Sequence, residues 1–185
     1  MRTRKPLASI LLIIMLSSPA LAKNKLDISF GWFQVSAKTA RTSGKLSNLG
    51  TYQLLFRKTF APKFEFGLGY SLSASKTISG DMAFGPDIGL YYFPITSTNG
   101  ESFTNSDLAF SISEHYKPFV GFGFHQRQYQ STQASYAGFS GTLGTEFFIS
   151  DSLSLKGELR LMNLTGPSNA SATETNLLFG SSFAF

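Results

Sequence analysis

The feature that most constrains the fold of this chain is an alternation of large apolar residues with small or polar ones. The alternation is clearest over residues 64–74, where apolar side chains occupy every even position: Phe64, Phe66, Leu68, Tyr70, Leu72 and Ala74. The odd positions between them hold only Glu, Gly and Ser. A period of two is that of a β-strand whose two faces meet different surroundings, so this segment predicts a strand with one apolar face.

Seven other segments repeat the pattern and predict seven further strands. Their apolar faces are Leu26, Ile28, Phe30 and Trp32; Tyr52, Leu54 and Phe56; Met82, Phe84, Ile88, Leu90 and Tyr92; Val120, Phe122 and Phe124; Phe139, Leu143 and Phe147; Leu153, Leu155, Leu159 and Leu161; and Leu177, Phe179, Phe183 and Phe185.

Two places depart from this regularity. After Trp32 the apolar positions change parity to Phe33, Val35 and Ala37, which predicts a slip of phase and a β-bulge in the first strand. The connection 95–114 is long for a turn, and Leu108, Phe110 and Ile112 alternate within it like a short strand. A ninth strand would break the even count, so we interpret this connection as an excursion that can extend one hairpin.

Alternation alone also fits a soluble β-sandwich or a lipocalin-like barrel. Three features favour a membrane barrel instead. The predicted strands run for about 10 to 13 residues, which exceeds the usual five or six and suits a tilted membrane strand. The small polar face fits the narrow interior of eight strands. Tight turns at 61–63 and 150–152 alternate with longer polar linkers at 38–48, 127–135 and 165–174. We therefore predict an all-β fold, an eight-stranded antiparallel up-and-down transmembrane β-barrel.

Composition agrees with this fold and argues against other classes. The chain has 19 Phe and 7 Tyr, and only 15% of its residues are charged, against about 25% in soluble domains. Its 16 basic residues exceed 11 acidic ones, but three of the basic residues lie in the first five positions. The remainder is nearly neutral and has no basic stripe, so we expect no nucleic-acid partner. The absence of Cys excludes disulfides and a lipoprotein anchor.

Residues 1–22 have the three parts of a secretory signal peptide. Basic Arg2, Arg4 and Lys5 precede an apolar run at 7–16, and Ala20-Leu21-Ala22 forms a small-x-small cleavage site. The alternative, a membrane anchor helix, needs about 20 apolar residues to cross roughly 30 Å of hydrocarbon, and this run is too short. We predict a signal peptide at 1–22 and a barrel domain at 23–185.

The mature sequence resembles the small outer-membrane β-barrels of the OmpA transmembrane-domain and OmpX type. The similarity lies in Gly-Leu-Tyr-Tyr-Phe-Pro at 89–94, Pro-Phe-Val-Gly-Phe-Gly at 118–123 and Gly-Thr-Glu-Phe-Phe-Ile-Ser at 144–150. The last strand, with Leu177, Phe179, Phe183 and Phe185, is similar to the signal read by the barrel-assembly machinery, although Ser181 is a polar departure.

This resemblance implies an integral protein of the bacterial outer membrane, secreted to the periplasm and then inserted. It implies outer-membrane lipid, lipopolysaccharide, the barrel-assembly machinery and periplasmic chaperones as partners, and we expect a monomer. Members of the family are often non-enzymatic, and some are adhesive or defensive. The sequence has no metal-ligand cluster and no phosphate-binding loop, so we expect no cofactor.

Strand parity also places a set of ionisable residues on the inner face of the barrel. They are Arg57, Asp87, His125, Glu146, Lys156, Glu158 and Arg160. Charges in so narrow an interior must be paired, and both signs are present, so a salt-bridged plug is the main hypothesis. The alternative is a small gated, porin-like channel. On the same reasoning we expect Gly69→Ser, on the inner face, to be milder than Leu68→Arg on the outer face.

A lipid A-modifying enzyme is the competing functional class. Such an enzyme needs a nucleophile and a base within hydrogen-bond reach. A tight register could bring Asp87 and Ser140 beside His125, which would form a Ser-His-Asp set, whereas Glu146 should lie too far along the barrel to join it. The lumen is remote from acyl chains, and His115 lies in the long connection, where we expect a surface role. We therefore expect no catalytic residues and a non-enzymatic protein with a structural or surface-interaction role in the cell envelope.

Overall fold

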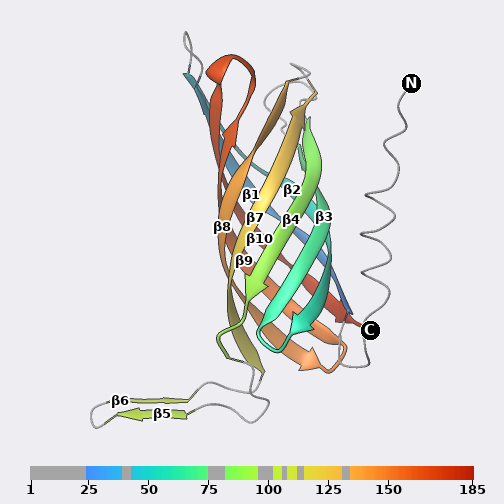
Figure 1. Cartoon of the computed structure of the whole chain (residues 1–185), viewed down its shortest axis with the longest axis vertical. Helices are drawn as coiled ribbons and strands as arrows, with labels where there is room; N and C mark the ends of the chain where they lie inside the picture. Colours follow the sequence, from blue (N-terminus) through green and yellow to red (C-terminus); the bar gives the residue numbers. More distant parts are fainter. Residues whose placement is uncertain are drawn as a thin grey trace.

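The computed structural model describes residues 24–38, 43–74, 82–95, 102–105, 108–111, 115–130 and 134–185. Eight of its strands close into one antiparallel barrel in the order β1-β10-β9-β8-β7-β4-β3-β2 (Figure 1). The barrel strands are β1 (Asn24–Lys38), β2 (Ser43–Ala61), β3 (Phe64–Ala74), β4 (Met82–Tyr92), β7 (Tyr116–Tyr129), β8 (Ser135–Ser150), β9 (Leu153–Thr165) and β10 (Ser171–Ala184). The predicted eight-stranded antiparallel barrel is confirmed.

The first and last strands close the barrel along their whole length. The ladder between β1 and β10 runs without a break from Lys25 opposite Ala184 to Lys38 opposite Ser171. Beyond it, the Asn24 N–H donates to the Phe185 carbonyl at 3.2 Å, and the Phe185 N–H donates back to the Asn24 carbonyl at 2.9 Å. Closure removes the unpaired strand edges that lipid could not satisfy.

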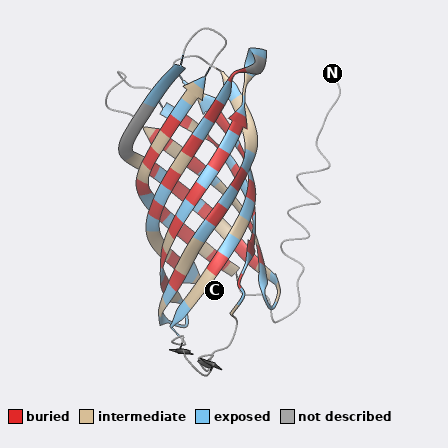
Figure 2. Ribbon diagram, turned by 90° about the vertical axis from the view of Figure 1, so that its left-hand side faces the viewer, coloured by how far each residue is buried: buried red, intermediate tan, exposed pale blue. Residues whose placement is uncertain are grey.

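The two faces of the wall differ as the sequence predicts. Buried and exposed residues alternate along the strands, which gives the chequered wall in Figure 2. The exposed positions carry large apolar side chains, and Phe122 and Leu143 each expose 61% of their surface. An apolar outer wall of this extent suits lipid rather than water. Among the described residues, no helix is long and apolar enough to cross a membrane.

The strands are longer than predicted, and the linkers between them are correspondingly shorter. The barrel strands have 11 to 19 residues. Residues 43–48, 127–129 and 171–174, predicted as polar linker, are paired strand ends. Backbone hydrogen bonds continue past the apolar belt because they do not depend on side-chain hydropathy. The predicted tight turns lie at Pro62–Lys63 and Asp151–Ser152, and a short 3-10 helix, η1 (Pro167–Asn169), joins β9 to β10.

The predicted phase slip in the first strand is wrong. Buried positions follow odd numbers without interruption from Lys25 to Val35, so Phe33 and Val35 face the lumen. The register with β2 does shift here, because Gly31 pairs with Thr51 whereas Trp32 pairs with Leu49. The extra residue is therefore Gly50 of β2. The apolar residues after Trp32 belong to the interior rather than to the lipid face.

The long connection contains a hairpin of its own. β5 (Ser102–Asn105) and β6 (Leu108–Ser111) pair with each other in a separate two-stranded sheet and do not join or extend the barrel. Figure 1 shows this hairpin beyond the end of the barrel that carries the tight turns, here called the turn end. The opposite end is called the loop end. The predicted signal peptide, residues 1–22, and Ile112 lie outside the described residues.

Candidate functional site

The lumen is lined by buried ionisable side chains from all eight barrel strands. All seven residues predicted to face inward lie there and are buried: Arg57, Asp87, His125, Glu146, Lys156, Glu158 and Arg160. The prediction missed five further buried lumen residues: Lys25, Asp27, Glu65, Arg127 and Glu174. The same signal could have found most of them, since Lys25 and Asp27 alternate with Leu26 and Ile28.

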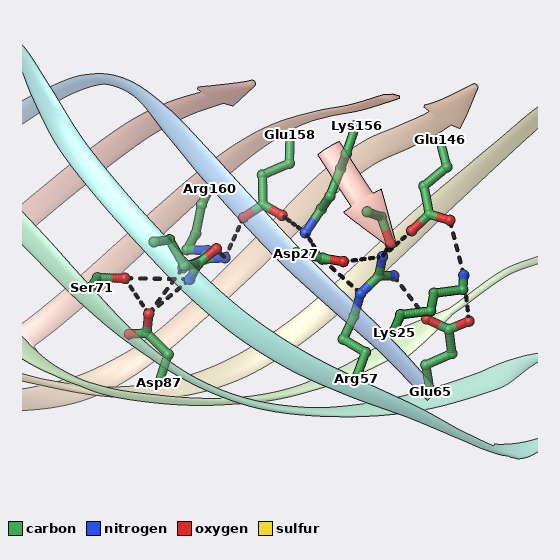
Figure 3. A network of polar contacts seen from close by, with 12 residues as sticks. Lys25, Asp27, Arg57, Glu65, Ser71, Asp87, Glu146, Lys156, Glu158 and Arg160 are labelled. Atoms are coloured by element: carbon green, nitrogen blue, oxygen red, sulfur yellow. Dashed lines mark hydrogen bonds and ion pairs between the residues drawn. The ribbon is translucent and has the colours of Figure 1, made fainter. Parts of the chain in front are cut away.

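Arg57 of β2 is the centre of the charge cluster nearest the turn end (Figure 3). Its Nε lies 2.8 Å from the Asp27 Oδ2, and its Nη1 lies 2.8 Å from the Glu65 Oε2. Its Nη2 contacts Glu146. Lys25 lies 2.8 Å from Glu65 and 3.0 Å from Glu146, so each of these carboxylates contacts two cations.

Lys156 extends this cluster along the inner face of β9. Its Nζ lies 2.9 Å from the Asp27 Oδ2 and 2.7 Å from the Glu158 Oε2. Glu158 also contacts Arg160, whose Nη2 donates to the Gln53 side chain at 3.2 Å. The ion pairs therefore run continuously from the turn end toward the middle of the barrel, with the signs alternating.

Asp87 of β4 forms a second cluster closer to the loop end. Its Oδ1 lies 2.7 Å from both the Arg127 Nη1 and the His125 Nδ1. Its Oδ2 accepts from the Gln53 Nε2 at 2.7 Å and from the Ser71 hydroxyl. Arg160 lies 3.8 Å away and joins the two clusters. The Arg57 Nη2 also donates to the Ser182 hydroxyl of β10 at 3.4 Å, so all eight barrel strands contribute to one connected polar network.

The structure brings together the Ser-His-Asp set considered from the sequence. The His125 Nε2 lies 2.6 Å from the Ser140 Oγ, while its Nδ1 contacts Asp87. A Cβ at Gly123 would lie 2.7 Å from the imidazole Nε2 and 2.9 Å from the hydroxyl, so the wall packs directly against both groups. Ser140 exposes 3% of its surface. The hydrogen bonds match those of a nucleophile and its base, and the barrel wall encloses both groups almost fully.

Neither Glu146 nor His115 takes part in this set. Glu146 lies in the cluster around Arg57, as its distance along the strand predicts. His115 is exposed beside β7, where its backbone carbonyl accepts from the Phe148 N–H at 2.7 Å.

Aromatic side chains fill the space beside the ions. The Tyr91 ring lies against Gly89 of its own strand and against one glycine of each neighbouring strand, since a Cβ at Gly67, Gly89 or Gly121 would come within 3.0 Å of it. Tyr91 also packs with Leu55, Phe93 and Phe119 in one buried cluster. The Arg57 guanidinium and the Lys156 ammonium each lie 5.6 Å from the Tyr91 ring centre, a distance suited to cation–π attraction.

An apolar layer occupies the lumen toward the loop end. Its buried members are Phe33, Val35, Met162, Leu164 and Ala172. Ala37 and Tyr136 pack against them. The Arg127 Nη2 lies 3.8 Å from the Met162 sulfur, so this layer follows directly on the Asp87 cluster. The interior therefore holds an ionic column and then an apolar layer.

The predicted assembly residues lie on the outer face of β10. Leu177, Phe179, Phe183 and Phe185 are all exposed, and Phe185 exposes 72% of its surface. The Phe185 ring centre lies 6.4 Å from that of Phe56 on β2. Ser181 is only partly buried and interrupts this stripe, as its polarity predicts.

A family model described as outer membrane protein beta-barrel domain matches residues 8–185. No curated protein matches the sequence.

Several solved structures share the fold. Neisserial surface protein A is 10% identical and superposes with a TM-score of 0.59, over 89% of this chain and 97% of that one. The outer membrane protein OprG from Pseudomonas aeruginosa is 14% identical with a TM-score of 0.50, over 88% and 95%. The N-terminal β-barrel domain of Pseudomonas aeruginosa OprF is 11% identical with a TM-score of 0.50, over 88% and 97%. At these identities the likeness concerns the fold alone.

Proposed function

Because this chain belongs to the outer membrane protein β-barrel domain family, we propose that it is a non-enzymatic barrel with a plugged lumen that supports the cell envelope or its surface interactions. In this proposal the protein acts through its wall and its two ends, not through transport across its interior. The turn end, where β1 begins and β10 ends, faces the periplasm, and the loop end faces outward.

The observation that carries the proposal is the continuous network of ion pairs across the lumen. An interior of eight strands is just wide enough for side chains to fill. Here Arg57, Lys156 and Arg160 each contact at least one carboxylate within the network. An ion entering this column would have to displace partners that are already paired and desolvated. The apolar layer around Phe33 and Met162 adds a second obstacle to ions.

Planar-bilayer recording of the purified protein tests the plug. We expect no steady conductance above that of the protein-free bilayer. Steady channels in the unmutated protein would overturn the plug and favour a small gated, porin-like channel.

The Ser140–His125–Asp87 arrangement is the observation that favours an envelope enzyme as the second candidate. A lipid A mass profile of a deletion strain, beside its parent, separates the two classes. The non-enzymatic proposal predicts identical profiles. A changed profile that a Ser140→Ala allele fails to restore would establish the enzyme.

The outer surface supports the remaining proposals about partners. The exposed aromatic and aliphatic side chains of the wall suit outer-membrane lipid and lipopolysaccharide. The outward stripe that ends in Phe185 suits recognition by the barrel-assembly machinery after periplasmic chaperones deliver the chain. We propose a monomer, since closure of β1 on β10 leaves no barrel edge for a second copy to pair with.

A further inference from the structure

One buried carboxylate of the lumen lies apart from the ion pairs. Glu174 of β10 exposes 1% of its surface, and its Oε1 accepts from the Asn176 Nδ2 at 2.9 Å. Asn176 exposes 2%. Within the described part of the chain, the Glu174 Oε2 and the Asn176 Oδ1 are both buried without a hydrogen-bond partner. From these two oxygens and the charges around them, we propose that Glu174 and Asn176 bind a monovalent alkali-metal cation.

The surroundings of Glu174 do not compensate its charge. Strand pairing places it between Val35 of β1 and Met162 of β9, which both belong to the apolar layer. An ionised carboxylate in such surroundings is costly unless it is paired. Asp27 avoids this cost by contacting Arg57 and Lys156, whereas no described Lys or Arg forms an ion pair with Glu174.

The two guanidinium groups closest by strand pairing are engaged elsewhere. Arg160 lies opposite Asn176 in the ladder between β9 and β10, but its Nη2 contacts Glu158 and Gln53. Arg127 reaches the Met162 sulfur with its Nη2, but its Nη1 lies 2.7 Å from Asp87. Both groups therefore pair with carboxylates other than Glu174.

The charges of the described lumen residues do not balance by themselves. Five residues are cationic: Lys25, Arg57, Arg127, Lys156 and Arg160. Six are carboxylates: Asp27, Glu65, Asp87, Glu146, Glu158 and Glu174. Lys58 is also buried, but it alternates with the inward-facing Arg57 on β2 and therefore lies on the outer face. A charge on His125 would compensate Asp87, which it contacts, rather than Glu174. One positive charge is therefore lacking, and Glu174 is the carboxylate that lacks it.

The two free oxygens define the class of cation. Carboxylate and amide oxygens are the ligands that hard cations prefer. Asn176 donates its amide N–H to Glu174, which leaves its carbonyl oxygen available to the same ion. A single carboxylate matches a single positive charge, whereas Ca²⁺ takes six to eight oxygen ligands. Among the described residues, no group of three or more His, Cys, Asp or Glu could hold a metal ion. A monovalent ion therefore fits this site better than a divalent one.

Reversible urea unfolding of the purified protein in lipid vesicles, at several sodium concentrations, tests this proposal. N-methyl-D-glucamine chloride replaces sodium chloride at constant ionic strength, so that general screening does not change. An ion that binds only the folded state stabilises it by mass action. Above the dissociation constant, the folding equilibrium constant should therefore rise about tenfold for each tenfold increase in sodium. A folding equilibrium that does not respond to sodium would overturn the proposal and would indicate that a proton or ordered water satisfies Glu174.

Three substitutions locate the sodium response. Glu174→Gln removes the charge with little change of shape and should abolish the response. Glu65→Gln is the matched control, because it neutralises a buried carboxylate that contacts Lys25 and Arg57, and it should keep the response. Asp151→Asn neutralises an exposed carboxylate and is the second control if Glu65→Gln does not fold. Heat-modifiable migration on gels verifies folding. A response that survives Glu174→Gln, or that a folded control also loses, would overturn the assignment to Glu174.

Discussion

At the scale of single residues, the lumen is held by carboxylates that contact several cations each. Glu158 contacts Lys156 and Arg160, and it is almost fully buried. Removing such a partner leaves cations buried without compensation, which costs more than the pair contributes when intact. Glu174 differs, because among the described residues its side chain accepts only from the Asn176 amide, at 2.9 Å.

We predict that Glu158→Ala lowers the free energy of unfolding by about 3–5 kcal/mol, since the buried Arg160 loses its nearest carboxylate. Urea unfolding followed by tryptophan fluorescence measures the change. Glu174→Gln is the matched control, a buried carboxylate whose neutralisation breaks no ion pair in the described network, and it should cost clearly less. Equal losses in the two variants would mean that pairing is not what stabilises the lumen.

At the scale of strands, some inner-face glycines let atoms of a neighbouring strand pack directly against the glycine backbone. The Phe119 ring of β7 covers Gly144 of β8, where an added Cβ would lie 2.3 Å from the ring and 2.7 Å from the Gly157 carbonyl oxygen. Gly69 is similar, since an added Cβ would lie 2.5 Å from the Leu54 carbonyl oxygen. We expected Gly69→Ser to be mild because a small polar side chain suits the lumen. The structure contradicts this reason, because there is no space for a side chain at Gly69.

We predict that Gly144→Ala destabilises the barrel, since Phe119 must leave its place in a packed cluster. Overpacking of this kind typically costs about 1–3 kcal/mol. Gly141→Ala is the control on the same strand, because Gly141 is exposed and a Cβ there would meet nothing within 4 Å. Urea midpoints of the two variants should separate clearly, and coincident midpoints would contradict the packing described for Gly144.

Phe185, which follows β10, has two features that could matter for assembly: an exposed ring and backbone hydrogen bonds to Asn24. Deleting Phe185 removes an exposed ring and also the backbone bonds to Asn24 that extend the closing ladder. Phe185→Ala removes only the ring. If the terminal aromatic is an assembly signal, both variants should show reduced heat-modifiable folded protein in outer-membrane fractions. Normal assembly of Phe185→Ala, with impaired assembly of the deletion, would assign the effect to barrel closure instead.

At the scale of the whole molecule, the apolar outer wall faces lipid. Residues half-way along the strands lie nearest the middle of the bilayer, and residues at the strand ends lie nearest its surfaces. Leu68 lies on the outer face of β3, opposite Phe56 on β2 and Ile88 on β4. Ser36 is exposed on β1 two residues before its loop-end terminus. The cost of a cation on the lipid face depends on depth, so these positions should respond differently.

We predict that Leu68→Arg destabilises the barrel by about 2–4 kcal/mol and that Ser36→Arg costs about 0–1 kcal/mol. Reversible unfolding in lipid vesicles measures the free energy of unfolding of both variants. Vesicles are used rather than micelles because the two positions must be compared in a bilayer of the same thickness. A cost at Ser36 that equals the cost at Leu68 would show that the apolar belt is not centred as the strand pairing indicates.

Outside the part of β1 that follows Trp32, the sequence by itself determined which side chains face lipid and which face the lumen. Side-chain direction in a strand has a local period of two, so Phe64–Ala74 could be assigned to the two faces without any partner strand. The same rule placed Arg57 and Glu146 inside. It also contained the signal for Lys25 and Asp27, which the prediction overlooked.

Only the tertiary structure decided which inner residues meet. Arg57 and Glu146 are 89 residues apart, and His125 reaches Asp87 and Ser140 across two different ladders. These contacts depend on the register of every ladder and on closure of β1 against β10, and a shift of one residue in any ladder would change them. Gly50 shows why such registers escape local patterns: the extra residue lies in β2, whereas the apolar residues that suggested a slip, Phe33 and Val35, lie in β1 and pack across the lumen.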